Sequence, residues 1–244
     1  MPNNAFMLST HNGFKNYNHT KYEISYLQFP SQINLLNINY NNFNFSILDY
    51  GFFEDKIDNF TNNTFNSYEG LVNYNFKKNI FNQFSLHKSI TSIISKIDHY
   101  TSIALMVNLK LQTNIPTSKI KLGFSINNFG LILKEYTNYN QNLPINTQLY
   151  IKKQINQNIN LGYNFDYYLN TEHIKHIFLI ALKINQLIDL RISNTNYSKN
   201  LYYNNYLING LAMGLSIKAS DAIYDISISN LGSAGYIYGM TMKF

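Results

Sequence analysis

The sequence predicts an all-β protein, an antiparallel transmembrane β-barrel of about fourteen strands, with twelve as the alternative count. The first observation is that apolar and polar residues alternate along most of the chain. Because successive side chains of a strand point to opposite faces, this pattern indicates strands with one apolar and one polar face. The second is that the polar face consists mainly of Gly, Ala, Ser and Asn. A soluble β-sandwich needs large branched residues inside and long polar residues outside. Small polar residues suit a crowded barrel interior, and a continuous apolar stripe suits lipid.

Composition supports one ordered β-rich unit. The chain has 244 residues, of which 45% are hydrophobic, 16% aromatic and 13% charged. This excludes a disordered chain, and all-β barrels of this length are commonly one domain. We therefore expect a single barrel domain over residues 1–244, with residues 1–20 as a truncated plug or a periplasmic segment. The net charge of +6 comes from scattered lysines and not from a basic block, so we expect no nucleic-acid partner.

Membrane and export signals are weak in this sequence. No run of eighteen apolar residues occurs, which excludes a membrane-spanning helix. A closed barrel is the other structure that satisfies every backbone polar group in lipid. The start, Met1-Pro2-Asn3-Asn4, has no basic region followed by an apolar one, so no signal peptide is visible. Three explanations stay open: a removed leader, a misplaced start, or a protein that is not an exported barrel.

The strands of the N-terminal half are less regular than the later ones. Residues 52–67 are rich in Asn, Asp and Thr and are predicted to form a long polar loop. The predicted strands are 22–29, 33–40, 43–50, 69–76, 81–89 and a weaker one at 92–97. The sequence contains no capped segment with sustained helical apolar spacing.

The C-terminal half alternates more clearly and ends on an aromatic stripe. Its predicted strands are 103–111, 120–127, 145–153, 159–167, 173–185, 187–194, 210–219, 222–230 and 234–244. In the last strand Tyr236, Tyr238 and Phe244 share one face with two methionines. Aromatic residues of membrane barrels lie at the lipid–water interfaces, so these three residues are the predicted barrel-closing signature.

One stretch carries a more specific signal. Residues 123–130 read Gly-Phe-Ser-Ile-Asn-Asn-Phe-Gly, and Leu143-Pro144-Ile145 follow after a polar segment. This resembles the PorV/PorQ family of outer-membrane proteins of the type IX secretion system. In that family a strand ends in Asn-x-Gly, here Asn128 and Gly130, and a short loop leads to Leu-Pro, here Leu143 and Pro144. Gly130 would permit the turn, and Pro144 as a strand's first residue would lose no ladder bond.

Other stretches are similar to the family more weakly. Asp49-Tyr50-Gly51 and the polar loop after it resemble the family's Tyr-Gly turn, and residues 210–244 resemble its last three strands. A departure lies at the start, where Asn3-Asn4-Ala5 stands in place of the family's Asn-Pro-Ala.

The resemblance implies a FadL-like barrel in the bacterial outer membrane. Its function would be that of a non-enzymatic component of a protein secretion and surface-attachment system. The partners would be outer-membrane lipid and either secretion-system subunits or exported proteins. The alternative is a FadL-like barrel that transports a hydrophobic or small solute. A third class is a soluble or surface-exposed β-protein, such as an adhesive or phage-structure subunit.

Catalytic and metal-binding patterns are not predicted. His173 and His176 differ in strand parity and therefore point to opposite faces, which separates them as metal ligands. Asp189 and Arg191 share a face and are expected to pair with neighbouring strands across the lumen. Asp166 and Asp225 also lie on the polar face, but nothing places them as an acid/base pair. The glycines open no helix and form no phosphate-binding motif. We expect no enzyme activity, no metal and no cofactor.

Overall fold

A computed structural model describes residues 22–55, 63–81, 83–137, 142–196 and 209–244. The predicted N-terminal plug or periplasmic segment, residues 1–20, lies outside the described residues. Among the residues described, no helix is long and apolar enough to cross a membrane.

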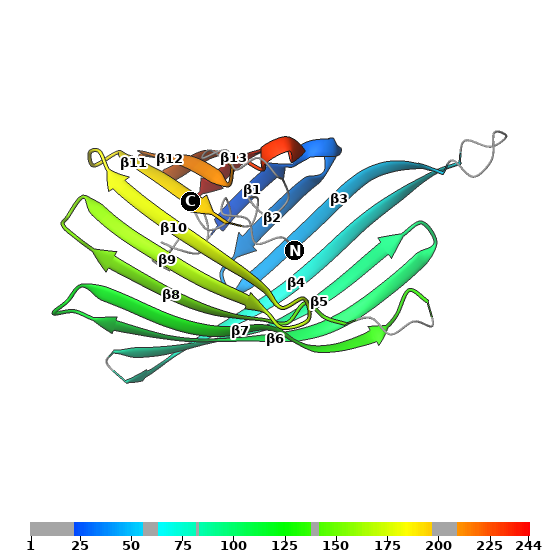
Figure 1. The fold of residues 1–244 in the computed structure, drawn as a ribbon, viewed down its shortest axis with the longest axis horizontal. Helices are drawn as coiled ribbons and strands as arrows, with labels where there is room; N and C mark the ends of the chain where they lie inside the picture. The colour runs from blue at the N-terminus through cyan, green and yellow to red at the C-terminus, as the bar shows by residue number, and fades with distance from the viewer. Residues whose placement is uncertain (1–21, 56–62, 82, 138–141, 197–208) are drawn as a thin grey trace.

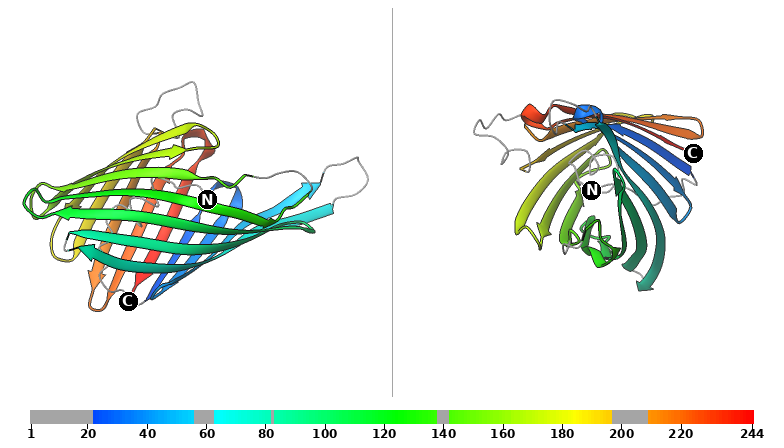
Figure 2. Two further views of the ribbon diagram at one scale, coloured as in Figure 1. Left: turned by 90° about the horizontal axis from the view of Figure 1, so that it is seen from below. Right: turned by 90° about the vertical axis from the view of Figure 1, so that its right-hand side faces the viewer.

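The described residues form fourteen antiparallel strands that close into one barrel. Each strand pairs with the next one along the chain, and the wall is continuous around the barrel axis (Figures 1 and 2). Two short 3₁₀ turns, η2 (Pro30–Gln32) and η4 (Gly232–Ala234), lie between strands. The strands are β1 (Tyr22–Gln28), β2 (Asn34–Tyr40), β3 (Phe43–Asp55), β4 (Asn63–Phe81), β5 (Phe84–Ile97), β6 (Tyr100–Ile115), β7 (Ile120–Lys134), β8 (Asn146–Gln154), β9 (Ile159–Tyr168), β10 (His173–Lys183), β11 (Ile188–Thr195), β12 (Leu211–Ala219), β13 (Ala222–Asn230) and β14 (Tyr236–Lys243).

Closure depends on the pairing of the first and last strands. β1 and β14 are antiparallel, with Ile24 opposite Met242 and Tyr26 opposite Met240. This pairing removes the two edges that an open sheet of the same strands would expose. The predicted fold class and the count of fourteen are confirmed.

The outer surface of the barrel is apolar. On β14, Tyr236, Tyr238 and Phe244 are about half exposed on the outside, while Ile237 and Thr241 between them are buried inside. The same alternation runs through the other strands, with exposed Leu, Ile, Val and Phe on the outer face. The apolar rows thus lie outside one closed sheet and not between two sheets. That arrangement suits a hydrocarbon environment and opposes a soluble sandwich.

An aromatic belt follows one rim. Tyr22 stacks on Tyr40 with ring centroids 5.1 Å apart, and Phe43 packs against Tyr74 at 4.7 Å. Phe76 continues the belt, 4.4 Å from Tyr74. Aromatic girdles of this kind mark the interface level of transmembrane barrels.

The two ends of the barrel differ in their connections. At the end that holds Tyr22 and Phe244, the connections are residues 41–42, 82–83, 116–119, 155–158, 184–187 and 220–221. We call this the short-turn end. At the opposite, long-loop end, three connections are longer: residues 56–62, 135–145 and 196–210.

Several strands are longer than predicted. The predicted polar loop at 52–67 is wrong, because β3 continues to Asp55 and β4 begins at Asn63. Gly51 has a positive φ of 78° and lies at a register shift between Asp49 and Phe52, so the predicted Tyr-Gly turn is a bulge inside β3. The segments 81–89 and 92–97 divide differently as well: Phe81 ends β4, and the remainder forms the single strand β5. Cross-strand backbone pairing carries these strands through positions where the alternation is weak.

Arginine substitutions on the outer face test whether this face contacts lipid. Ile226 lies outward in the middle of β13, and Ala222 lies on the same face at the strand's first residue. Ile226→Arg should lower the free energy of unfolding by about 2–4 kcal/mol, and Ala222→Arg by about 0–1 kcal/mol, because the cost of a charge depends on membrane depth. Guanidinium unfolding from phospholipid vesicles measures both values. Equal losses at the two depths would contradict a lipid-facing surface.

Candidate functional site: the barrel lumen

The inner face of the barrel is built from small hydroxyl and amide side chains. On β2 and β3, the Asn37 Oδ1 atom accepts hydrogen bonds from Asn44 Nδ2 at 2.5 Å and from Ser46 Oγ at 2.8 Å. On β5 and β6, Asn108 Nδ2 donates to Ser89 Oγ at 2.8 Å. The sequence-based assignment of the small polar face to the interior is therefore correct.

One part of the inner face is apolar, which the sequence did not indicate. Leu27, Leu35, Leu48 and Ile237 are buried together on β1, β2, β3 and β14 near the long-loop end. Phe29, Ile33, Tyr50 and Leu231 pack against them. These leucines share strand parity with polar residues such as Ser25 and Asn37, so alternation alone does not distinguish them from the polar lining.

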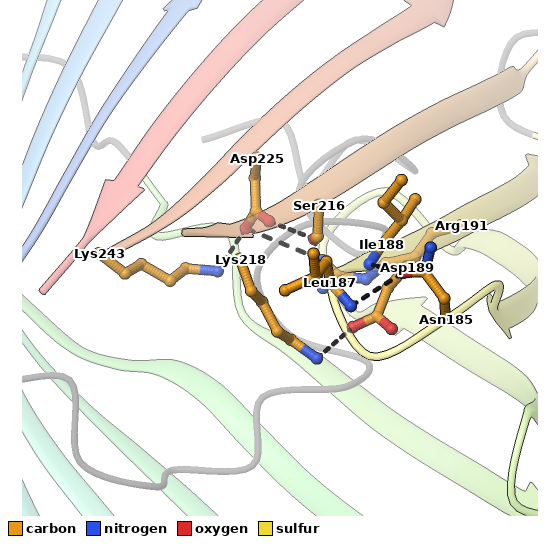
Figure 3. A network of polar contacts seen from close by, with 9 residues as sticks. All are labelled: Asn185, Leu187, Ile188, Asp189, Arg191, Ser216, Lys218, Asp225 and Lys243. Atoms are coloured by element: carbon orange, nitrogen blue, oxygen red, sulfur yellow. Dashed lines mark hydrogen bonds and ion pairs between the residues drawn. The ribbon is translucent and has the colours of Figure 1, made fainter. Parts of the chain in front are cut away.

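Charged residues of β11 to β14 form a bonded network near the short-turn end (Figure 3). Asp225, with only 2% of its side chain exposed, accepts a hydrogen bond from Ser216 and pairs with Lys243. Arg191 donates to Ser216 Oγ at 2.8 Å, and its Nη1 lies 3.9 Å from Asp225 Oδ2. The expected lumenal pairing of Arg191 is confirmed.

A second ion pair lies beside this network. Lys218 Nζ is 3.1 Å from Asp189 Oδ2, and Lys183 on β10 is the register partner of Asp189. The expected pairing of Asp189 with a neighbouring strand is thus also confirmed. Its carboxylate lies against the Lys218 ammonium of β12.

Asp166 is buried on β9 between the neighbouring strands. Its Oδ1 accepts a hydrogen bond from Gln148 Nε2 at 2.7 Å, and Lys175 lies opposite it in register on β10. Both charged side chains are almost fully buried. The Gln148–Asp166 hydrogen bond thus joins β8 to β9, and the cation of Lys175 stands beside the buried carboxylate on β10.

The opposite side of the lumen carries an excess of positive charge. Five inward-facing residues of β4 to β8 define a surface that we call the basic wall: Lys77, His87, Lys110, Lys121 and Lys152. Lys110 Nζ lies 4.6 Å from the centroid of the Tyr150 ring. That ring occupies the space above Gly123, where an added Cβ would lie 1.8 Å from a ring carbon. The sequence signal for this wall was present, because Lys110 and Lys121 both fall on the polar parity.

The predicted family-motif residues lie at an irregularity of the wall and not at a strand end. Asn128 has a φ of 60°, and β7 has an extra residue here relative to β6, which makes a β-bulge. The Asn128 backbone N–H donates to Asn108 Oδ1 at 2.7 Å, and its Nδ2 donates to the Pro144 carbonyl at 3.0 Å. The asparagine thereby connects β6, β7 and the segment before β8.

The predicted turn at Gly130 is wrong. Gly130 lies inside β7, which continues to Lys134, and an added Cβ would lie 2.0 Å from the Leu105 carbonyl oxygen. The glycine is needed because β6 approaches closely after the bulge. Leu143 and Pro144 precede β8, which begins at Asn146, so Pro144 is not a strand residue. The Leu143 carbonyl accepts the Ile145 N–H at 2.8 Å.

The two histidines considered as metal ligands lie on opposite faces of β10. His173 points inward, and His176 lies on the outer side, where its Nδ1 is 2.8 Å from the Tyr163 hydroxyl. In the part of the chain that the structure describes, no group of three His, Cys, Asp or Glu residues could hold a metal ion.

Comparisons with known proteins find the fold but no sequence relative. No protein-family model and no curated protein matches the sequence. Among solved structures, the Pseudomonas putida toluene transporter TodX matches with a TM-score of 0.56 and 10% identity, over 98% of this chain and 95% of that one. The Ralstonia pickettii toluene transporter TbuX matches with a TM-score of 0.54 and 8% identity, over 91% and 86%. At these identities the likeness shows the fold alone, which is that of a closed antiparallel membrane β-barrel.

Gly130 provides a test of the bulge geometry. Gly130→Ala should lower stability by about 1–3 kcal/mol, because the new methyl group meets backbone that is held in the sheet. Gly70→Ala on β4 is the control, since its Cβ would be 3.9 Å from the nearest neighbouring atom, the Ile94 carbonyl oxygen. Urea or guanidinium unfolding of both variants gives the comparison. A tolerated Gly130→Ala together with a destabilising Gly70→Ala would refute the assignment.

Asp225 tests the ionic network. Asp225→Asn should cost about 3–5 kcal/mol, because it leaves Lys243 and Arg191 buried without the carboxylate. The double variant Asp225→Asn/Lys243→Met should recover part of this loss. Asp221→Asn on the exposed β12–β13 turn should change stability by no more than about 0.5 kcal/mol. If Asp225→Asn matched Asp221→Asn in an unfolding titration, the network would have no role in holding the wall together.

Proposed function

We propose that this protein is an outer-membrane channel that lets small solutes cross the bilayer by diffusion. The observation that best supports this proposal is a closed barrel with an apolar outer face and an inner face lined by hydroxyl, amide and charged groups. Such a wall separates lipid from a polar path, which is the basic property of a porin-like barrel.

The unequal ends support a membrane orientation. In outer-membrane barrels the short turns face the periplasm and the longer loops face the exterior. The short-turn end of this barrel, with Tyr22 and Phe244, would then be periplasmic. The long-loop end, with the buried cluster around Leu27 and Ile237, would be extracellular.

The solved structures of similar fold favour transport over docking. Two of them are described as toluene transporters. The lining of this lumen differs from what a hydrocarbon requires, since charged groups occur on most inward faces of the short-turn half. We therefore propose a polar solute for this chain.

We also propose that the protein is not an enzyme. Asp189 and Asp225 each lie against cations, and Asp166 is hydrogen-bonded to Gln148 and faces Lys175 in register. These contacts join neighbouring strands, so the three carboxylates have a structural role in the wall.

A role in protein secretion is the second candidate. The observation that favours it is the Asn128–Pro144 contact, which gives the PorV/PorQ-like motif a defined place between β7 and β8. A pull-down from detergent-solubilised membranes should then recover secretion-system subunits or exported proteins. Recovery of neither, from a preparation that retains the folded barrel, would reject this candidate.

Cysteine labelling tests the channel directly, because the chain contains no cysteine. Gln112 faces the lumen on β6, and its neighbour Leu111 faces outward. In proteoliposomes, a charged thiol reagent should modify Gln112→Cys and slow solute-driven swelling. Leu111→Cys, placed in lipid, should stay unmodified and keep the swelling rate. Vesicle-inserted protein that gives no swelling at all would overturn the proposal.

A further inference from the structure

We propose that the solutes of this channel are anions, small carboxylates or phosphates, that are drawn along the basic wall. The inference rests on the proposed channel function and deepens it by assigning the chemical class of the solute. The basic wall consists of Lys77, His87, Lys110, Lys121 and Lys152, as defined above.

The charge of this wall is not balanced by carboxylates of its own strands. Across β4 to β8 the one carboxylate within the strands is Glu69. Glu69 lies near the long-loop end, where its Oε1 accepts a hydrogen bond from Ser95 Oγ at 3.3 Å. The lysines of the wall lie toward the other end.

The basic residues lie on neighbouring strands. His87 on β5 stands in register between Lys77 on β4 and Lys110 on β6. Lys121 on β7 and Lys152 on β8 are register partners as well. The lysines therefore lie on one continuous stretch of wall, from β4 to β8.

The opposite wall does not cancel this field. Its carboxylates are matched by their own cations: Asp225 by Lys243 and Arg191, and Asp189 by Lys218 (Figure 3). Glu23 on β1 stands in register with Lys243 and accepts a hydrogen bond from Asn39 Nδ2 at 3.0 Å. Among the residues that the structure describes, the inward-facing charges near the short-turn end thus sum to a positive value.

A charged channel with low-dielectric walls concentrates the oppositely charged ion. Such a surface raises the local concentration of counter-ions by roughly tenfold or more. Lysine ammonium groups bind carboxylate and phosphate oxygens as compact point charges. Cations would meet a repulsive region in the same place, so the channel should discriminate by charge sign.

Reversal potentials in planar bilayers under a KCl gradient provide the test. The wild-type protein should prefer chloride over potassium, and Lys110→Gln/Lys121→Gln/Lys152→Gln should reduce the permeability ratio severalfold, toward one. The matched control is Lys78→Gln/Lys88→Gln/Lys153→Gln, which removes the same charge from the outer face of β4, β5 and β8. It should leave the ratio unchanged. A wild-type preference for potassium, or equal shifts in both triple variants, would overturn the inference.

A measurement on the wild-type protein covers the case in which the lumenal triple variant does not fold. Its chloride preference should be strong at about 0.1 M salt and weak at about 1 M, since the screening length falls from about 10 Å to about 3 Å. Proteoliposomes should also swell faster in gluconate than in glucose. A preference that is independent of salt would assign selectivity to size and reject the basic wall as its source.

The measurements separate a failure of the proposed anion selectivity from a failure of the proposed channel activity. Conductance without anion preference would reject the inference and keep the channel. Vesicle-inserted protein without conductance would reject the channel, and the inference with it.

Discussion

The pairing of β1 with β14 is the constraint on which the rest of this structure depends. In a hydrocarbon environment an unpaired backbone N–H or C=O costs several kcal/mol, so a sheet can cross only when it has no open edge. Here the backbone bonds between Tyr22 and Phe244 continue the ladder to the rim of the short-turn end. Once the sheet is closed, every strand has an inside and an outside, and the alternation of the sequence becomes a separation of lipid from lumen.

That separation explains why the charges occur where they do. The strand faces that meet lipid carry Leu, Ile and aromatic residues, so most ionisable groups of the wall are collected inside the barrel. On β11 to β14 these charged side chains are of both signs and form ion pairs between neighbouring strands. On β4 to β8 they are almost all basic. The lumen is consequently asymmetric: one wall is internally neutralised and the other is positive, and this asymmetry gives the proposed channel its selectivity.

The irregular positions follow from the geometry of the wall. A bulge at Asn128 shifts the side-chain parity of β7 by one, so Phe129, Leu131 and Leu133 face outward, whereas Phe124 and Leu122 did so before it. Without this shift, three large apolar side chains would point into the lumen. Gly130 then permits the close approach of β6. The residues that resembled a family motif therefore have a local structural role in the wall.

The sequence by itself determined the fold class and the faces of most strands, because side chains alternate with period two and a slip of one residue would turn every apolar side chain to the other face. It favoured fourteen strands and left twelve open; the structure has fourteen. It also placed Asp189, Arg191 and Asp225 on the lumenal face and separated His173 from His176. The sequence did not predict the lengths of the strands. Residues 52–55 and 63–68 belong to the sheet because they pair with one another across β3 and β4, regardless of local composition.

Only the tertiary structure decided which lumenal charges meet. Lys243 and Asp225 lie on different strands, and Lys110, Lys121 and Lys152 lie on three. Their contacts depend on strand register around the barrel, which no single segment encodes. The apolar cluster of Leu27, Leu35, Leu48 and Ile237 has the same origin, because closure brings the first three strands against the last one. The face to which a side chain points follows from its position along the strand, so the sequence shows it. Which charged side chains contact one another depends on how the closed barrel sets the strands side by side.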